Sequence, residues 1–268
     1  MRLLPPITLT SAMGRYGGTL IHCRRDHYGV LEVVDTHGVR SLHFGTRPRQ
    51  SAMSLAEPDR LELAYVRAML SALIFTAEPE RILLLGLGGG SLARFLLAHY
   101  PNCRIDAVER RADVAQIAHN YFGLPQDARL TVHIAEACGY TETEAERNEE
   151  TYDLLLIDAY DHQGMDRSVN AEEFFRACAG LLRPQGALAM NLWGTHHVAL
   201  KHSTGLLRAC FPGKSFRLPV PNKGNVIGLG LGNEIATPCV KNLSAKAEAL
   251  AVQLGLEMQY FLRNLRGL

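Results

Sequence analysis

The chain has 268 residues, of which 47% are hydrophobic and 21% charged, and its formal net charge is +1. A chain of this length can form one large α/β domain with an appendage. The nearly neutral charge argues against nucleic acid or an anionic membrane as the main partner. No stretch approaches the ~18 apolar residues of a membrane span, and Pro5-Pro6 interrupts any signal-peptide pattern. The sequence therefore predicts a cytoplasmic protein.

The six cysteines are scattered along the chain without CxxC spacing. This arrangement favours reduced, packed thiols over a disulfide framework. It also gives no indication of a metal site, because metal-binding cysteines and histidines recur at short, regular spacings.

Residues 1–50 have the pattern of a small antiparallel β domain, and residues 51–268 that of a larger α/β domain. Strands are expected over 19–23, 30–34 and 39–44, with Asp- and Gly-containing turns between them. A helix is expected over 59–75, with Pro58 in its first turn. That helix is apolar nearly all round, so it should be buried between the two domains.

The apolar run Ile82–Gly86 leads into a glycine cluster and then into an amphipathic helix. A glycine-rich turn between a strand and a helix allows backbone N–H groups to approach a ligand closely. Gly86, Gly88 and Gly90 have the spacing of a nucleoside-binding turn of the S-adenosylmethionine type. Gly88-x-Gly90-x-x-Ala93 fits the dinucleotide fingerprint equally well. A tight turn without a ligand is the third interpretation.

Acidic residues follow the next two expected strands. Glu109 ends the strand over 104–108, where a carboxylate can accept both hydroxyls of a ribose. Glu136 follows the strand over 130–134 and could accept the exocyclic amine of adenine. Each could instead be an ordinary acidic residue at the start of a helix.

Two further carboxylates, Asp158 and Asp161, follow the buried strand over 152–157. Both should face the crevice that holds the glycine turn. One carboxylate can hold an ammonium group by charge-assisted hydrogen bonds while the other takes its proton. The pair therefore suits a cationic substrate, although Asp158 could also serve only to cap the turn.

From Arg81 onward strands and helices alternate, which predicts a Rossmann-like, doubly wound and mostly parallel sheet. Further helices are expected over 171–182, 198–210 and 244–254, and further strands over 187–192, 215–219 and 226–231.

With these strand-end acids, the chain resembles the polyamine aminopropyltransferase family, the spermidine and spermine synthases. The resemblance covers nearly the whole length. The residues that carry it are Gln50, Tyr65, Gly86-Leu-Gly-Gly-Gly90, Glu109, Glu136, Tyr152-Asp153 and Asp158-Ala-Tyr-Asp161.

The resemblance implies a methyltransferase-like fold that binds decarboxylated S-adenosylmethionine as co-substrate and releases methylthioadenosine. Glu109 would bind the ribose and Glu136 the adenine, with Gln50 and the glycine turn completing the nucleoside site. Asp158 would be the base in an SN2 attack by an amine. Asp161 would bind that amine, Tyr65 would donate a hydrogen bond in the amine channel, and the protein would be a homodimer.

Several positions depart from the family pattern. Gly89 stands where the family usually has the aspartate that holds the aminopropyl nitrogen. Val66 and Arg67 replace a histidine or glutamine and a glutamate, and His162 replaces a proline. Asn222-Lys223 replaces an expected tyrosine, so amine recognition is depleted on both sides of the site.

Three functional hypotheses follow. The first is an aminopropyltransferase with altered amine specificity. The second is an S-adenosylmethionine-dependent methyltransferase, in which Arg67 or Lys223 attracts the ligand carboxylate that Gly89 no longer repels. The third is a nucleoside-binding protein without activity. We favour the first, since keeping both Asp158 and Asp161 makes little sense without a cationic substrate. A nicotinamide dehydrogenase ranks below these, because no hydride-transfer site is evident.

Overall fold

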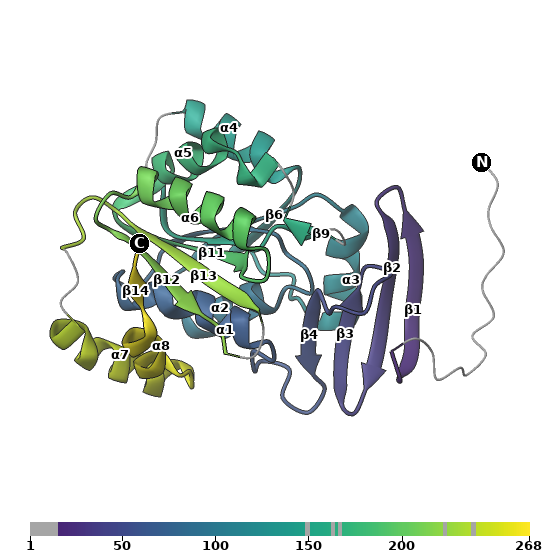
Figure 1. Ribbon diagram of the computed structural model, residues 1–268. Helices are drawn as coiled ribbons and strands as arrows, with labels where there is room; N and C mark the ends of the chain where they lie inside the picture. Colours follow the sequence, from purple (N-terminus) through teal and green to yellow (C-terminus); the bar gives the residue numbers. More distant parts are fainter. Residues whose placement is uncertain (1–15, 148–150, 162–163, 166–167, 222–223, 237–239) are drawn as a thin grey trace.

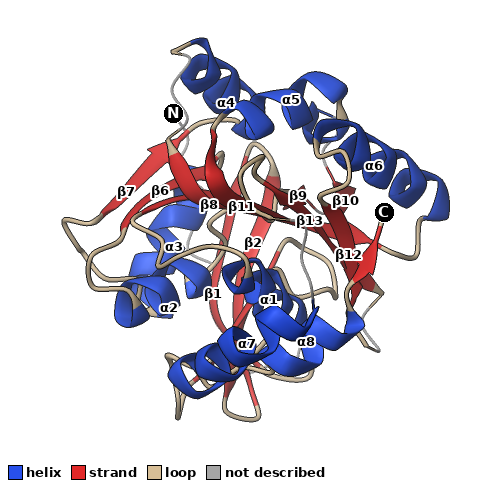
Figure 2. Ribbon diagram, turned by 90° about the vertical axis from the view of Figure 1, so that its left-hand side faces the viewer, coloured by secondary structure: helices blue, strands red, loops and turns tan. Residues whose placement is uncertain are grey.

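The computed structural model describes residues 16–147, 151–161, 164–165, 168–221, 224–236 and 240–268 (Figure 1). An N-terminal antiparallel sheet lies beside a larger mixed sheet that has helices on both faces (Figures 1 and 2).

The N-terminal sheet has four strands in chain order, β1 (Thr19–Asp26), β2 (Gly29–Thr36), β3 (Val39–His43) and β4 (Ser51–Ser54). The expected hairpins are present. His37 and Gly38, with φ of 49° and 76°, form the β2–β3 turn, because positive φ at both positions suits the twist of a hairpin. The sheet includes β4, so it runs past residue 50, where the sequence places the end of the N-terminal domain.

The helix predicted over 59–75 is shorter than expected. It begins as α1 (Ala64–Met69) and continues as the 3₁₀ helix η1 (Leu70–Ile74), so Pro58 does not lie in its first turn. Leu61 instead forms an antiparallel bridge with Met53, and this pairing outweighs helical propensity in the preceding segment. All five residues of η1 are buried, as the apolar pattern predicts.

The large sheet has eight strands in the order β14-β12-β13-β11-β8-β5-β6-β7. The five from β11 to β7 pair in parallel, and β13, β12 and β14 add antiparallel pairs at the other side. Their bounds are β5 (Arg81–Leu85), β6 (Arg104–Glu109), β7 (Leu130–Ile134), β8 (Tyr152–Ile157), β11 (Leu182–Trp193), β12 (Ser215–Pro219), β13 (Asn225–Leu231) and β14 (Arg266–Gly267). The doubly wound, mostly parallel sheet is confirmed, whereas β14 is not predicted.

Alternate residues of β5 belong to two different cores. Ile82 and Leu84 face the core formed with α1, η1, α2, α7 and α8, and Leu83 and Leu85 face the core formed with α5 and α6. Figure 1 shows these helix groups below and above the sheet. The helices are α2 (Ser91–His99), α3 (Ala112–Phe122), α4 (Ala137–Glu146), α5 (Glu172–Gly180), α6 (His197–Cys210), α7 (Val240–Leu254) and α8 (Met258–Asn264), with a 3₁₀ turn η2 (Ser168–Asn170).

A third core joins the two sheets. Val114, Ile117 and Phe122 of α3 pack against Leu31, Val33 and Leu42 of the N-terminal sheet. This packing on α3 holds the N-terminal sheet next to the carboxyl ends of β5 and β6. A small hairpin of β9 (Tyr160–Asp161) and β10 (Gly164–Met165) follows β8.

Candidate active site

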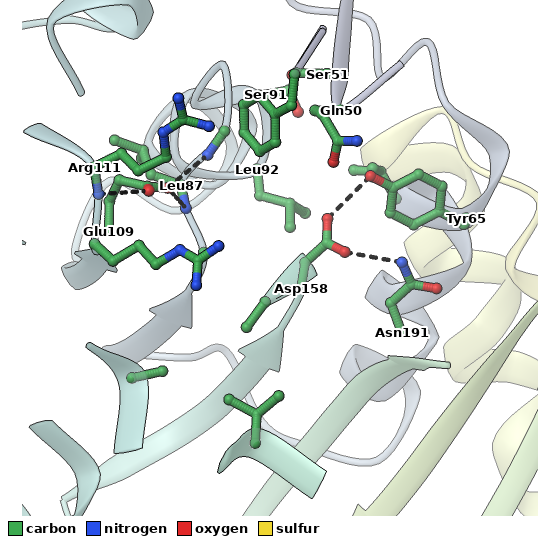
Figure 3. A pocket seen from close by; sticks show the side chains of 18 of the residues that line it. Gln50, Ser51, Tyr65, Leu87, Ser91, Leu92, Glu109, Arg111, Asp158 and Asn191 are labelled. Atoms are coloured by element: carbon green, nitrogen blue, oxygen red, sulfur yellow. Dashed lines mark hydrogen bonds between the residues drawn. The ribbon is translucent and has the colours of Figure 1, made fainter. Parts of the chain in front are cut away.

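A cavity of about 380 Å³ opens at the carboxyl ends of β5, β6 and β8. Its wall includes the glycine turn, the segment between β3 and β4, and residues of β11 and the β13 entry. This is where open α/β sheets bind ligands, and the volume suits a small molecule. Figure 3 shows two groups of polar side chains in the cavity, one around Glu109 and one around Asp158.

The glycine turn forms the floor between these groups. Gly86 has φ of 99°, and a Cβ there would meet the backbone oxygen of Asp158 at 2.4 Å. Gly86 and Gly88 line the cavity. Gly90 lies behind it, where its φ of 74° starts α2 and its Cα faces Leu124. The turn thus brings β5 and β8 together more closely than any side chain at Gly86 would allow.

Glu109 lies at the end of β6 with only 8% of its surface exposed. Its Oε2 accepts a hydrogen bond from the Leu87 N–H at 3.2 Å, and its Oε1 accepts one from the Arg111 N–H at 3.0 Å. Burial raises the pKa of Glu109, while these backbone donors act in the opposite direction. The carboxylate is therefore fixed in orientation before any ligand arrives.

Glu136, the residue that precedes α4, is held by the N-terminal sheet. Its Oε1 accepts a hydrogen bond from Tyr28 Oη at 2.9 Å. Tyr28 lies in the β1–β2 turn, and the Arg110 guanidinium lies 4.7 Å from the centre of its ring. Next to it, Asp26 accepts two hydrogen bonds from Arg111 at 2.9 and 2.8 Å. The sequence does not indicate this contribution of the β1–β2 turn, since only tertiary packing brings it to β6.

Asp158 is partly buried at the end of β8. Tyr65 Oη donates to its Oδ2 at 3.0 Å and Asn191 Nδ2 donates to its Oδ1 at 2.8 Å (Figure 3). Asn225 Nδ2 donates in turn to Asn191 Oδ1 at 2.9 Å. Burial raises the pKa of Asp158, and the two donors counteract it. The sequence analysis singles out Asp158 and Tyr65 but misses both asparagines.

Gln50 projects into the cavity on the Tyr65 side in Figure 3, beyond the end of β3. The backbone of Asp161 lies in β9, but its side chain is outside the part of the chain that the structure describes. His162, Asn222 and Lys223 lie outside that part of the chain altogether, backbone included.

Arg67 does not face the cavity. Its Nε donates to Glu257 at 3.2 Å, and its guanidinium also donates to the Leu61 carbonyl at 2.9 Å. It therefore neither repels a polyamine in the cavity nor attracts a ligand carboxylate there. Gly89 does not itself line the cavity, and a Cβ there would lie 2.6 Å from Oγ of Ser51, a residue of the cavity wall, and 2.9 Å from the ring of Phe122.

Within the described residues, no helix combines the length and apolarity needed to cross a bilayer. In the same residues, no cluster of three or more His, Cys, Asp or Glu side chains could hold a metal ion.

The chain is similar to known proteins over nearly its whole length, although no protein-family model matches it. It is 33% identical to the polyamine aminopropyltransferase of Neisseria meningitidis serogroup A, over 95% of this chain and 95% of that protein. The chain belongs to the polyamine aminopropyltransferase family.

Two solved structures share the fold. One is a probable spermidine synthase from Corynebacterium glutamicum, with a TM-score of 0.72 and 22% identity, over 90% of this chain and 92% of that one. The other is human methyltransferase-like protein 13 in complex with SAH, with a TM-score of 0.65 and 24% identity, over 77% and 95%. The methyltransferase-like fold is thus common to aminopropyltransferases and methyltransferases.

Proposed function

We propose that this family member transfers the aminopropyl group of decarboxylated S-adenosylmethionine to an amine and releases methylthioadenosine. The observation that carries the proposal is the Asp158 carboxylate. Tyr65 and Asn191 hold it in the same cavity as the buried Glu109. One cavity thus has a carboxylate suited to a ribose and another suited to an amine.

The nucleoside would lie over the glycine turn. Glu109 would accept the ribose hydroxyls, because its backbone donors leave further lone pairs of the carboxylate available. Glu136 would accept the amine of adenine while Tyr28 holds its carboxylate in place.

The close backbone of Gly86 and Gly88 would leave room for the ligand, with Gly90 shaping the turn behind them. Gln50, whose backbone oxygen lies near Gly88, would contact the ligand from the segment between β3 and β4.

The reaction would be an SN2 displacement. The amine nitrogen attacks the propyl carbon next to the sulfonium, the carbon–sulfur bond breaks, and its electron pair stays on sulfur as a neutral thioether. The attacking amine must be neutral, so Asp158 would take one proton from it. A carboxylate whose pKa burial raises is a better base than an exposed one. Orientation of the two substrates would supply much of the rate.

The amine would approach from the Asp158 side. Tyr65 would donate a hydrogen bond in this channel, and Asp161 would hold the remote ammonium of the acceptor. The acceptor is therefore expected to be a diamine or polyamine.

Methyl transfer is the alternative, and the comparisons favour aminopropyl transfer over it. The full-length relative is a polyamine aminopropyltransferase, while the methyltransferase structure is under 25% identical and shows the fold alone. Arg67 also lies outside the cavity, which removes one of the cations that could attract the carboxylate of S-adenosylmethionine.

Two measurements test the proposal. Calorimetry with S-adenosylmethionine, its decarboxylated form and methylthioadenosine in one buffer should show preference for the latter two. A diamine screen should then give turnover that Asp158→Asn abolishes while nucleoside binding survives. Tighter binding of S-adenosylmethionine, or a fully active Asp158→Asn variant, would contradict the proposal.

We also infer a homodimer that works in the cytoplasm. Among the described residues, the partly exposed β1 forms one edge of the N-terminal sheet, and an edge strand can pair with a second chain. The five described cysteines are free thiols, which fits a reducing compartment. Analytical ultracentrifugation tests the dimer.

A further inference from the structure

The carboxylate of Asp158 is connected to β13 through a chain of side-chain amides. Asn191 Nδ2 donates to Asp158 Oδ1 at 2.8 Å, and Asn225 Nδ2 donates to Asn191 Oδ1 at 2.9 Å. Asn191 is only 3% exposed. In the antiparallel pairing of β11 and β13, Asn225 lies opposite Trp193, so it is the diagonal neighbour of Asn191 on one sheet face.

The orientation of the Asn191 amide matters because an amide has a donor end and an acceptor end, whereas a carboxylate only accepts. With its nitrogen toward Asp158, Asn191 stabilises the ionised carboxylate. Turned over, it would bring its oxygen against the carboxylate and favour the protonated form. Asn225 donates to the Asn191 oxygen and so stabilises the first orientation.

We propose that Asn225 is a positioning residue for the aminopropyl transfer proposed above. It fixes the amide of Asn191 with the nitrogen toward Asp158, so that the carboxylate is ionised and correctly turned when the amine arrives. The inference rests on the role of Asp158 as the base.

Other charged groups around Asp158 leave this interpretation intact. Tyr65 is the titratable side chain of α1 that faces Asp158, and β13 has no ionisable side chain. Arg67, Arg81 and Arg183, on α1, β5 and β11, pair with Glu257, Asp106 and Asp153. The same cavity is lined by Arg49, Glu109, Arg110, Arg111 and Glu136. Asp161 follows on β9, and its side chain lies outside the described residues.

Two substitutions of Asn225 distinguish loss of its donor group from reversal of the Asn191 amide. Asn225→Ala removes the N–H group that donates to the Asn191 oxygen and so removes this preference for one orientation of the amide. Asn225→Asp replaces the donor by an acceptor of nearly equal size, which should turn the amide over. We expect the acid limb of the pH profile of kcat/KM to move upward in both. The shift should be about one pH unit in the alanine variant and larger in the aspartate variant.

Asn233→Asp is the matched control. Asn233 is exposed in the turn after β13, and the change has the same chemistry and charge without contact to Asn191. This variant should keep the wild-type profile. If Asn225 only supports the fold, its variants would melt earlier and lose activity equally at every pH, and the proposal would be wrong.

A second readout does not depend on turnover. With ¹³C-labelled aspartate, NMR titration of the Asp158 carboxyl, assigned by its loss in Asp158→Asn, should give a higher pKa in both Asn225 variants. If the wild-type protein transfers no aminopropyl group, the proposed function fails, yet this titration still tests the amide chain. An unchanged Asp158 titration in both variants would overturn the inference itself.

Discussion

Gly86→Ala should disrupt the junction on which both groups of polar side chains depend. A Cβ at this position would lie 2.4 Å from the backbone oxygen of Asp158 and 2.9 Å from its carbonyl carbon. The ends of β5 and β8 would have to separate by about 1 Å to reach an ordinary contact of 3.4 Å. The φ of 99° adds strain for any residue with a side chain.

The expected cost follows from these two effects. Backbone strain contributes about 1 to 3 kcal/mol, and overpacking contributes a similar amount. The free energy of unfolding should fall by about 2 to 6 kcal/mol. The melting temperature should then fall by about 4 to 24 °C, since 1 kcal/mol corresponds to about 2 to 4 °C in a large domain.

Two other glycines serve as matched controls in urea and thermal denaturation. Gly88 has φ of 54° and no atom nearer than 3.7 Å to a new Cβ, so Gly88→Ala should show the strain alone. Gly205, inside α6, has open space, so Gly205→Ala should raise stability by about 0.5 to 1 kcal/mol. If Gly86→Ala is no less stable than Gly88→Ala, the close approach to Asp158 does not constrain position 86.

Three further changes test the nucleoside half of the site. Tyr28→Phe removes the hydrogen bond that orients Glu136, so calorimetry should show methylthioadenosine binding weakened about two- to tenfold; unchanged affinity would exclude a positioning role. Gly89→Asp should lower the melting temperature and not improve use of decarboxylated S-adenosylmethionine, because its Cβ would overlap Ser51; a gain in affinity would contradict this geometry. Burial raises the pKa of Glu109, so folding favours the protonated form of this carboxyl group. The stabilisation that this preference gives is complete below the pKa that Glu109 has in the unfolded chain. It is lost as the pH rises through the pKa that Glu109 has in the folded protein. Glu109→Gln should therefore melt at a higher temperature than wild type at pH 7 and not at pH 4, while nucleoside binding falls; an equal difference at both pH values would refute this explanation.

Much of the fold can be predicted from short-range patterns. The strands over 130–134, 152–157 and 215–219 have the predicted bounds, because runs of apolar and β-branched residues end at clear turn residues. The prediction fails where distant segments meet. Because Leu61 forms a bridge with Met53, α1 begins later in the sequence than predicted. The strand β14 forms only because Arg266–Gly267 pairs with β12.

The candidate site also has residues that the sequence predicts and residues that it does not. Motif spacing brings Gly86, Glu109 and Asp158 to one cavity, because residues that follow parallel strands share one edge of the sheet. No local signal indicates Tyr28 or Asn225. Tyr28 reaches Glu136 across 108 residues of chain, through the packing of α3 on the N-terminal sheet.

Two of the residues that sequence patterns miss, Tyr28 and Asn191, donate to carboxylates that the patterns find, and a third, Asn225, donates to Asn191. A carboxylate at a strand end is mobile and hydrated by default, so its position in the sequence does not make it a ribose ligand or a base. Backbone N–H groups hold Glu109, and the amide of Asn191 holds Asp158. Burial raises the pKa of Asp158, and its donors keep the ionised form accessible. In the proposed mechanism, this balance would give a carboxylate that is ionised and still basic enough to take a proton from an amine. If these roles hold, the antiparallel strand β13 and the β1–β2 turn contribute to the site alongside the parallel strands that contain the motifs, Asn225 through Asn191 and Tyr28 through Glu136.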